Sequence, residues 1–180
     1  MLKKLLVTSA AILAVSSTAA LANGVPYVGA GLGIKNTSGQ RFMPINVFAG
    51  YGEIVSPGLY LGGELNADLA SVNLNDSNTF KTTYGLGVSV IPGMMLSDST
   101  MLYGRLGVVR SNFNKYSSNL VNGGQLGLGV QTRLTQNVDL RGEYVYTKYQ
   151  SFSRTVSGTR VGVTSLASDQ VNLGLVYKFA

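Results

Sequence analysis

The sequence predicts an all-β fold: a closed, eight-stranded, antiparallel up-and-down transmembrane β-barrel with short periplasmic turns and four longer extracellular loops. Residues 172–179 indicate this most clearly, because polar and apolar side chains alternate there with a period of two. Seven further segments of similar length repeat the alternation. In addition, 45% of the chain is hydrophobic and only 12% is charged, which is apolar for a secreted soluble domain. A barrel that turns its apolar face to lipid accounts for all three observations.

The N-terminal segment, residues 1–22, is predicted to be a cleaved signal peptide. Two lysines precede a short apolar run at residues 5–15, and Ala20-Leu21-Ala22 has the small-x-small pattern of a signal-peptidase site. Cleavage before Asn23 leaves residues 23–180 as the outer-membrane barrel domain. An uncleaved membrane anchor is the alternative.

The first four predicted strands each place large apolar side chains on one face and polar or small residues on the other. The first alternates aliphatic residues with glycines, and the second sets Asn46 and Phe48 inward. The third sets Glu64 inward, and the fourth turns Tyr84 and several aliphatic residues outward. Their expected bounds are residues 25–34, 44–53, 59–69 and 82–91.

The last four predicted strands follow the same rule. The fifth sets Arg105 inward, the sixth alternates leucine with glycine and glutamine, and the seventh sets Arg141 and Glu143 inward. The eighth is the terminal segment. Their expected bounds are residues 101–111, 123–134, 139–149 and 170–179. Eight strands is an allowed even number for a single-chain bacterial barrel.

The connections between these segments fall into two groups. Short connections with turn-forming residues are expected on the periplasmic side, together with both termini, at residues 53–58, 92–100 and 135–138. Longer polar connections are expected to be extracellular loops, at residues 35–43, 70–81, 112–122 and 150–169. Lys35 is counted among the cations of the first loop.

Four charged residues are expected to form a network inside the barrel. Glu64, Arg105 and Glu143 lie at similar depth in strands that run the same way, and Arg141 lies one inward position below Glu143. These opposite charges should pair, because an unpaired ion inside a narrow tube is costly. Since the interior of an eight-stranded barrel is just wide enough for side chains, the network is interpreted as a plug that locks the barrel.

Two pairs of cations are candidates for contacts outside the barrel. Arg110 and Lys148 should point outward near the extracellular rim, toward the phosphates of lipopolysaccharide; snorkelling into water, or a strand that has already ended, is the alternative. Arg154 and Arg160 in the last loop are candidates for binding anionic partners: lipopolysaccharide, sulfated or sialylated host glycans, or acidic receptor patches. The alternative is that these loop charges only keep the loop soluble.

The residue types that are missing narrow the range of functions. The chain has no Cys and no His, which excludes disulfides, thiol chemistry and hydrolytic sites that depend on His. We therefore expect no enzyme activity, no catalytic residue, no metal site and no cofactor. The net charge of +6 comes from scattered basic residues, so nucleic acid is not an expected partner.

Three further features accompany the signal peptide and the eight strands: the segments Tyr60-Leu61-Gly62-Gly63-Glu64-Leu65 and Leu102-Tyr103-Gly104-Arg105-Leu106-Gly107, and a C-terminal signal formed by Asn172, Gly174, Tyr177 and Phe179. In these features the chain resembles the small outer-membrane β-barrels, in particular the OmpA-like transmembrane domain and the opacity and OmpX-type surface proteins. Ala180 departs from this pattern, since such strands usually end on the aromatic residue.

This resemblance implies an integral protein of the outer membrane of a Gram-negative bacterium, inserted by the barrel-assembly machinery that reads the C-terminal signal. It implies a structural and surface-exposed role, in envelope integrity, adhesion or contact with a host surface. The alternative function is a narrow, low-conductance, porin-like channel, gated by Glu64, Arg105 and Glu143.

Overall fold

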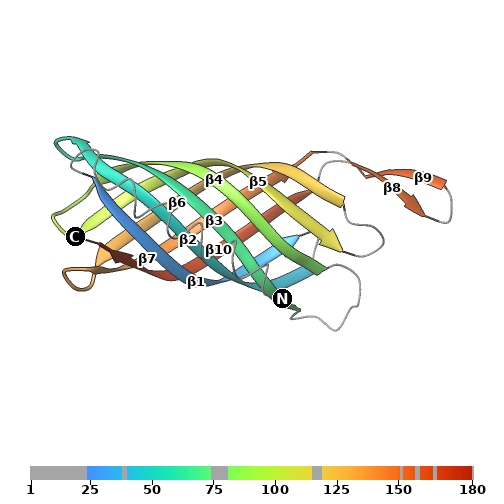
Figure 1. The fold of residues 1–180 in the computed structure, drawn as a ribbon, viewed down its shortest axis with the longest axis horizontal. Coiled ribbons are helices and arrows are strands. Elements are labelled where there is room, and N and C mark those ends of the chain that lie inside the picture. The colour runs from blue at the N-terminus through green and yellow to red at the C-terminus, as the bar shows by residue number, and fades with distance from the viewer. Residues whose placement is uncertain are drawn as a thin grey trace.

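The computed structural model describes residues 24–37, 40–73, 81–114, 119–150, 152–156, 159–163 and 166–179. Eight antiparallel strands close into a barrel, as predicted (Figure 1). Around the barrel their order is β1, β10, β7, β6, β5, β4, β3, β2. The barrel strands are β1 (Val25–Thr37), β2 (Gln40–Ser56), β3 (Leu59–Asn73), β4 (Lys81–Met95), β5 (Thr100–Asn114), β6 (Asn119–Arg133), β7 (Val138–Tyr149) and β10 (Ala167–Lys178).

Two further strands, β8 (Phe152–Val156) and β9 (Thr159–Val163), pair in a separate two-stranded sheet. This hairpin stands beyond one end of the barrel, which we call the hairpin end (Figure 1). The opposite end, where β2–β3, β4–β5 and β6–β7 are joined, we call the turn end. The sequence predicted only a polar loop at residues 150–169, and the hairpin was missed.

The barrel strands extend further toward the hairpin end than predicted, so the connections there are shorter. The β1–β2 ladder continues through Lys35↔Phe42 and Asn36↔Arg41, in a segment that was predicted to be a loop. That prediction was wrong because Lys35, Asn36 and Thr37 place polar residues on both faces of β1 here, and the alternation on which it relied disappears. The expected loops at residues 70–81 and 112–122 are likewise shortened, since β3 ends at Asn73 and β5 ends at Asn114.

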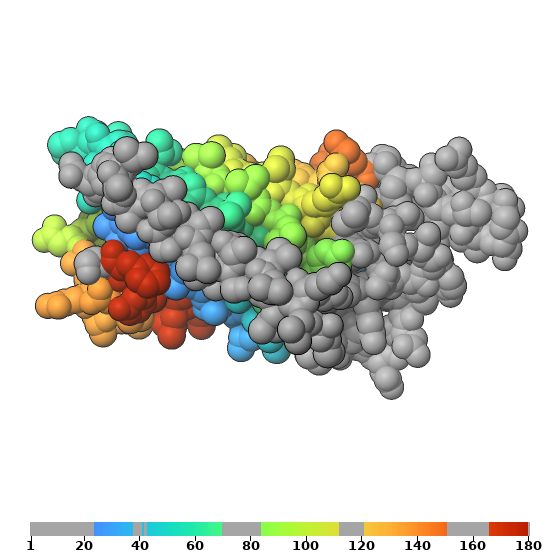
Figure 2. All heavy atoms as spheres, viewed as in Figure 1, coloured from blue at the N-terminus to red at the C-terminus, as the bar shows by residue number. Residues whose placement is uncertain are grey.

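The turn end is built from tight connections and from the meeting of the first and last barrel strands. Gly58 has a φ of 80°, in the left-handed region that glycine adopts without steric cost. The strand β10 pairs with β1 along its length, and the backbone N–H of Phe179 donates to the carbonyl of Pro26 at 3.0 Å. Figure 2 shows the end of β10, in red, beside the start of β1, in blue. These hydrogen bonds close the barrel.

The outer wall is apolar and the interior is largely polar, as the alternation predicted. Leu173 and Leu175 on β10 are 61% and 52% exposed, whereas the inward Val176 between Leu175 and Tyr177 is fully buried. Outward aromatic residues lie near both ends: Tyr177 and Phe179 at the turn end, and Tyr84, Tyr144 and Tyr146 toward the hairpin end. Such aromatic groups mark the two interfaces of membrane barrels. In the described residues, no helix is long and apolar enough to cross a membrane.

Candidate functional site

The four charged residues predicted for the interior lie together at the centre of the barrel. Arg105 donates from Nε to Glu143 Oε1 at 2.6 Å and from Nη2 to Glu64 Oε1. Arg141 donates from Nη1 to the other oxygen of Glu64, Oε2, at 2.5 Å. Each of the four side chains is 7% exposed or less. Glu64 is therefore the hub, with one arginine on each carboxylate oxygen.

Neutral side chains complete the hydrogen bonding of this network. Tyr27 donates its hydroxyl to Glu64 Oε2 at 3.0 Å, and Arg105 Nη1 donates to Ser89 Oγ at 3.3 Å. Gln131 accepts at Oε1 from Arg141 Nε and Nη2, at 3.0 and 2.8 Å. Hydrogen bonds that satisfy both members of an ion pair are what make such a pair tolerable when it is buried.

The guanidinium group of Arg141 is also enclosed by aromatic rings. Its Cζ atom lies 4.4 Å from the ring centre of Phe48, 5.1 Å from that of Tyr103 and 5.4 Å from that of Tyr27. All three distances are within the range of a cation–π interaction, which is stronger in a desolvated site. The sequence placed Phe48 and Tyr103 on the inner face, but gave no sign that both rings meet the same arginine.

A second polar network lies nearer the hairpin end, around Asp68. Lys35 Nζ is 3.4 Å from Asp68 Oδ2 and 3.5 Å from the hydroxyl of Tyr149. Asn46 and Gln170 donate to Asp68 Oδ1 at 3.0 and 3.4 Å. The expectation that Lys35 is a loop cation is therefore wrong: the residue is 4% exposed and faces the interior. Inward glycines at positions 31 and 33 continue directly to Lys35, and this parity is the signal that could have identified it.

A third polar group lies toward the turn end. Lys178 Nζ is 3.0 Å from Asp139 Oδ1 in an ion pair, and Gln131 Nε2 donates to Asp139 Oδ2 at 2.6 Å. With this pair, the charges inside the described part of the barrel balance. Four cations (Lys35, Arg105, Arg141, Lys178) are ion-paired with four anions (Glu64, Asp68, Asp139, Glu143). The described interior charges therefore contribute no net charge, and the exposed cations Arg41, Arg110 and Lys148 lie outside this balance.

Arg110 and Lys148 are exposed on the outer face near the hairpin end. Arg110 on β5 pairs with Asn122 on β6, and Lys148 on β7 pairs with Gly124 on β6. Neither cation forms an ion pair with a carboxylate in the part of the chain that the structure describes. Arg41 on β2 is a further exposed cation at this end.

The other predicted site residues are distributed over the last strands. Arg154 lies in β8 opposite Val161, and Arg160 lies in β9 opposite Thr155, so the two arginines occupy neighbouring register pairs. Their side chains are outside what the structure describes. On β10, Asn172 and Gly174 face the interior, while Tyr177 and Phe179 face outward. The signal peptide and Ala180 lie outside the described residues.

A closed barrel with an apolar outer wall and a paired, charged interior defines a class of protein, the transmembrane β-barrels. The chain belongs to one family within this class, the outer membrane protein beta-barrel domain, whose family model matches residues 5–179. It is therefore an integral outer-membrane barrel protein.

Solved structures of similar fold include small barrels from other bacteria. Neisserial surface protein A (NspA) has 20% sequence identity and a TM-score of 0.55, with 88% of this chain and 98% of that chain covered. Ail, the attachment invasion locus protein of Yersinia pestis, has 16% identity and a TM-score of 0.52, with 87% and 97% covered. At these identities the likeness concerns the fold alone. A search of curated protein sequences found no match.

Proposed function

We propose that this protein is a surface-exposed outer-membrane barrel whose hairpin end faces away from the cell and binds anionic, sulfated or sialylated glycans. The observation that carries the proposal is the distribution of charge outside the barrel interior. Five cations stand against one anion in the strands near the hairpin end: Arg41, Arg110, Lys148, Arg154 and Arg160 against Asp169. Near the turn end, by contrast, two anions, Glu53 and Asp98, stand against one cation, Arg133.

This asymmetry matters because the interior charges are already paired with one another. The excess of cations near the hairpin end therefore produces a positive potential, which attracts anions and raises their rate of association. Ail, which shares the fold, has been crystallised in complex with the heparin analogue sucrose octasulfate. That complex is an example of a small barrel of this fold with a sulfated ligand, and it supports the choice of heparin as a probe.

Replacing Arg154 and Arg160 together by alanine is expected to weaken heparin binding roughly two- to thirtyfold, because exposed ion pairs contribute about 0.2–1 kcal/mol each. Binding of the refolded barrel to immobilised heparin at several salt concentrations measures the effect, and added salt should weaken the wild-type interaction. Arg133→Ala is the matched control, since Arg133 is an exposed cation at the turn end. Binding that is insensitive to salt and equal in all three proteins would contradict the proposal.

We also propose how the protein reaches the membrane and what surrounds it there. Residues 1–22 are removed as a signal peptide, and the barrel-assembly machinery reads β10. With the hairpin end facing outward, Arg110 and Lys148 lie against lipopolysaccharide phosphates. No enzyme activity is proposed. The role is structural and adhesive: a rigid barrel that presents cations to anionic surfaces.

A narrow channel is the second candidate function, because Arg105 lies between two carboxylates and could exchange one for the other. Against it, the central network and the three rings around Arg141 fill the passage. Planar-bilayer recordings of the refolded protein distinguish a plug from a gate. A plug predicts that no single-channel current is seen, whereas a gate predicts brief openings that become frequent in Arg105→Gln. Silence of both proteins would exclude the channel.

A further inference from the structure

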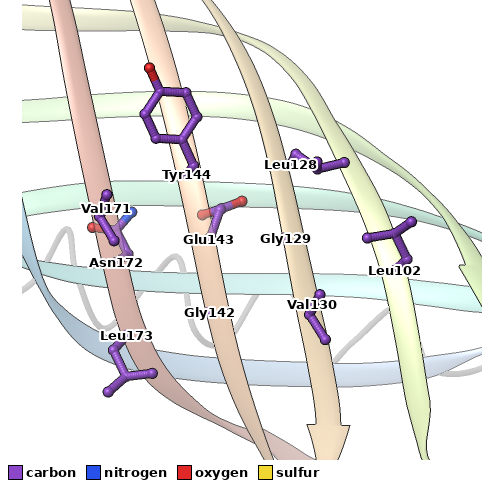
Figure 3. Close-up of a pocket in the computed structure, with 10 residues that line it drawn as sticks. All are labelled: Leu102, Leu128, Gly129, Val130, Gly142, Glu143, Tyr144, Val171, Asn172 and Leu173. Carbon is purple, nitrogen blue, oxygen red and sulfur yellow. The ribbon is translucent and has the colours of Figure 1, made fainter.

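A shallow groove of about 380 Å³ lies in the outer wall of the barrel, across β5, β6, β7 and β10 (Figure 3). Gly142 forms its floor, between Val130 of β6 and Leu173 of β10. A Cβ atom at Gly142 would meet no atom within 4 Å, so the absence of a side chain leaves the wall indented there. The side chains around the groove are apolar or aromatic: Leu102, Leu128, Val130, Tyr144, Val171 and Leu173.

The depth of the groove follows from its distance to the rim. Gly142 and Lys148 lie on the outward face of the same strand, six residues apart. At about 3.3 Å per residue and a tilt of about 35–45°, this corresponds to a depth of roughly 15 Å. The hydrocarbon core of a bilayer is about 30 Å thick, so the groove lies about one leaflet below Lys148. The ends of the acyl chains of that leaflet reach this depth.

The two exposed cations above the groove lie on either side of β6. Gly124 of β6 pairs with both Val108 and Lys148, and Arg110 is the next outward residue after Val108. A Cβ atom at Gly124 would also meet no atom within 4 Å, so the wall is open over this residue, which lies between the two strands that carry the cations. An arginine and a lysine on either side of an open position suit a phosphate group, which accepts charge-assisted hydrogen bonds from both.

One hydrogen bond holds the upper edge of the groove in place. The hydroxyl of Tyr144 donates to Asp169 Oδ1 at 2.5 Å. This bond uses the carboxylate of Asp169, which is the one anion on the outer face of the described strands near the hairpin end. The hydrogen bond positions the ring of Tyr144 as one wall of the groove. Asp169 keeps its negative charge, but the exposed cations Arg41, Arg110 and Lys148 outnumber it at this rim.

We propose that the groove over Gly142 binds one acyl chain of lipid A, the phosphorylated anchor of lipopolysaccharide, with a phosphate of the same molecule against Arg110 and Lys148. The proposal rests on the orientation in the proposed function, because lipopolysaccharide occupies the outer leaflet. It does not require that the hairpin end binds glycans.

Native mass spectrometry of the refolded barrel, titrated with lipid A in detergent, tests the proposal. Gly142→Leu fills the groove and should weaken lipid A binding roughly tenfold, the effect of losing contact with about two methylene groups. The double variant Arg110→Ala/Lys148→Ala should weaken it as well. Gly63→Leu is the matched control. Gly63 faces outward on β3, four strands around the barrel from β7, and a Cβ atom there would also meet no atom within 4 Å.

Three results would overturn the proposal. The first is lipid A binding that Gly142→Leu leaves unchanged or that Gly63→Leu weakens equally. The second is binding of phosphatidylglycerol with the same affinity and the same dependence on Gly142, since the groove would then accept any acyl chain. The third is a wild-type dimer that Gly142→Leu abolishes, since the occupant would then be a second copy of the chain. If heparin binding fails while lipid A binding depends on Gly142, only the glycan function falls.

Discussion

Replacing Arg105 by alanine is expected to lower the free energy of unfolding by about 3–5 kcal/mol, the usual cost of removing one partner from a buried ion pair. The change leaves Glu143 without a cation and Glu64 with Arg141 alone. Because the site is closed to water by its neighbours, the freed carboxylates cannot recover their hydration. Urea unfolding of the barrel in detergent or lipid vesicles, followed by circular dichroism, measures the difference.

Arg110→Ala is the matched control for this experiment. Arg110 lies on the same strand as Arg105, five residues further on, but it is exposed on the outer face. Its removal should change stability by at most about 0.5 kcal/mol, as for most surface substitutions. Arg105→Lys keeps the charge but loses the planar group that contacts both carboxylates. Its loss in the free energy of unfolding should lie between those of Arg105→Ala and Arg110→Ala. Equal losses in Arg105→Ala and Arg110→Ala would mean that the central network does not stabilise the barrel.

Gly129→Ala is expected to destabilise the barrel by about 1–3 kcal/mol, the range for extra atoms in a well-packed core. A methyl group at Gly129 would lie 2.4 Å from the ring of Tyr103. Tyr103 is 1% exposed and packs with Ile91 and Met101, so its ring has little room to move. Its displacement would also disturb the enclosure of Arg141. The same unfolding measurement reports this loss.

Gly124→Ala separates this steric effect from the general effect of replacing a glycine in a strand. Gly124 lies on β6 as Gly129 does, but a methyl group there would meet no atom within 4 Å. The substitution should be neutral or stabilise the barrel by up to about 1 kcal/mol, because it reduces the freedom of the unfolded chain. If the two variants behave alike, the close packing of Tyr103 on Gly129 is not a source of stability.

The sequence was sufficient for the parity of the strands and for the central network. Around Glu64, Arg105 and Glu143 the outward positions hold apolar residues or glycine and the inward positions are largely polar, so both their direction and their relative depth could be counted. The assignment of inward and outward positions failed where the contrast between apolar and polar residues ends. Around Lys35 both faces of β1 are polar, because one lies against the inner network and the other at the rim. Only the parity continued from Gly31 and Gly33 marks Lys35 as an inward residue of a strand.

The aromatic enclosure of Arg141 was out of reach for a different reason. Phe48, Tyr103 and Tyr27 come from three strands, and their meeting depends on the relative shift of those strands around the barrel. That shift is a property of the closed sheet and not of any one segment. The β8–β9 hairpin was missed because its strands are only five residues long and contain few large apolar residues. Segments of this length show too few repeats of polar and apolar residues to indicate a strand.

The pairing of β1 with β10 has a consequence for how the chain folds. Tyr27 and Lys178 are register partners although they lie near opposite ends of the sequence, so this ladder cannot form early from local contacts. Until it forms, β1 and β10 each keep an edge of unpaired backbone groups, which hydrocarbon does not tolerate. We therefore expect stable insertion to be all-or-none. A partly assembled sheet would stay at the aqueous interface, and the pairing of β10 with β1 would be the step that commits the molecule to the membrane.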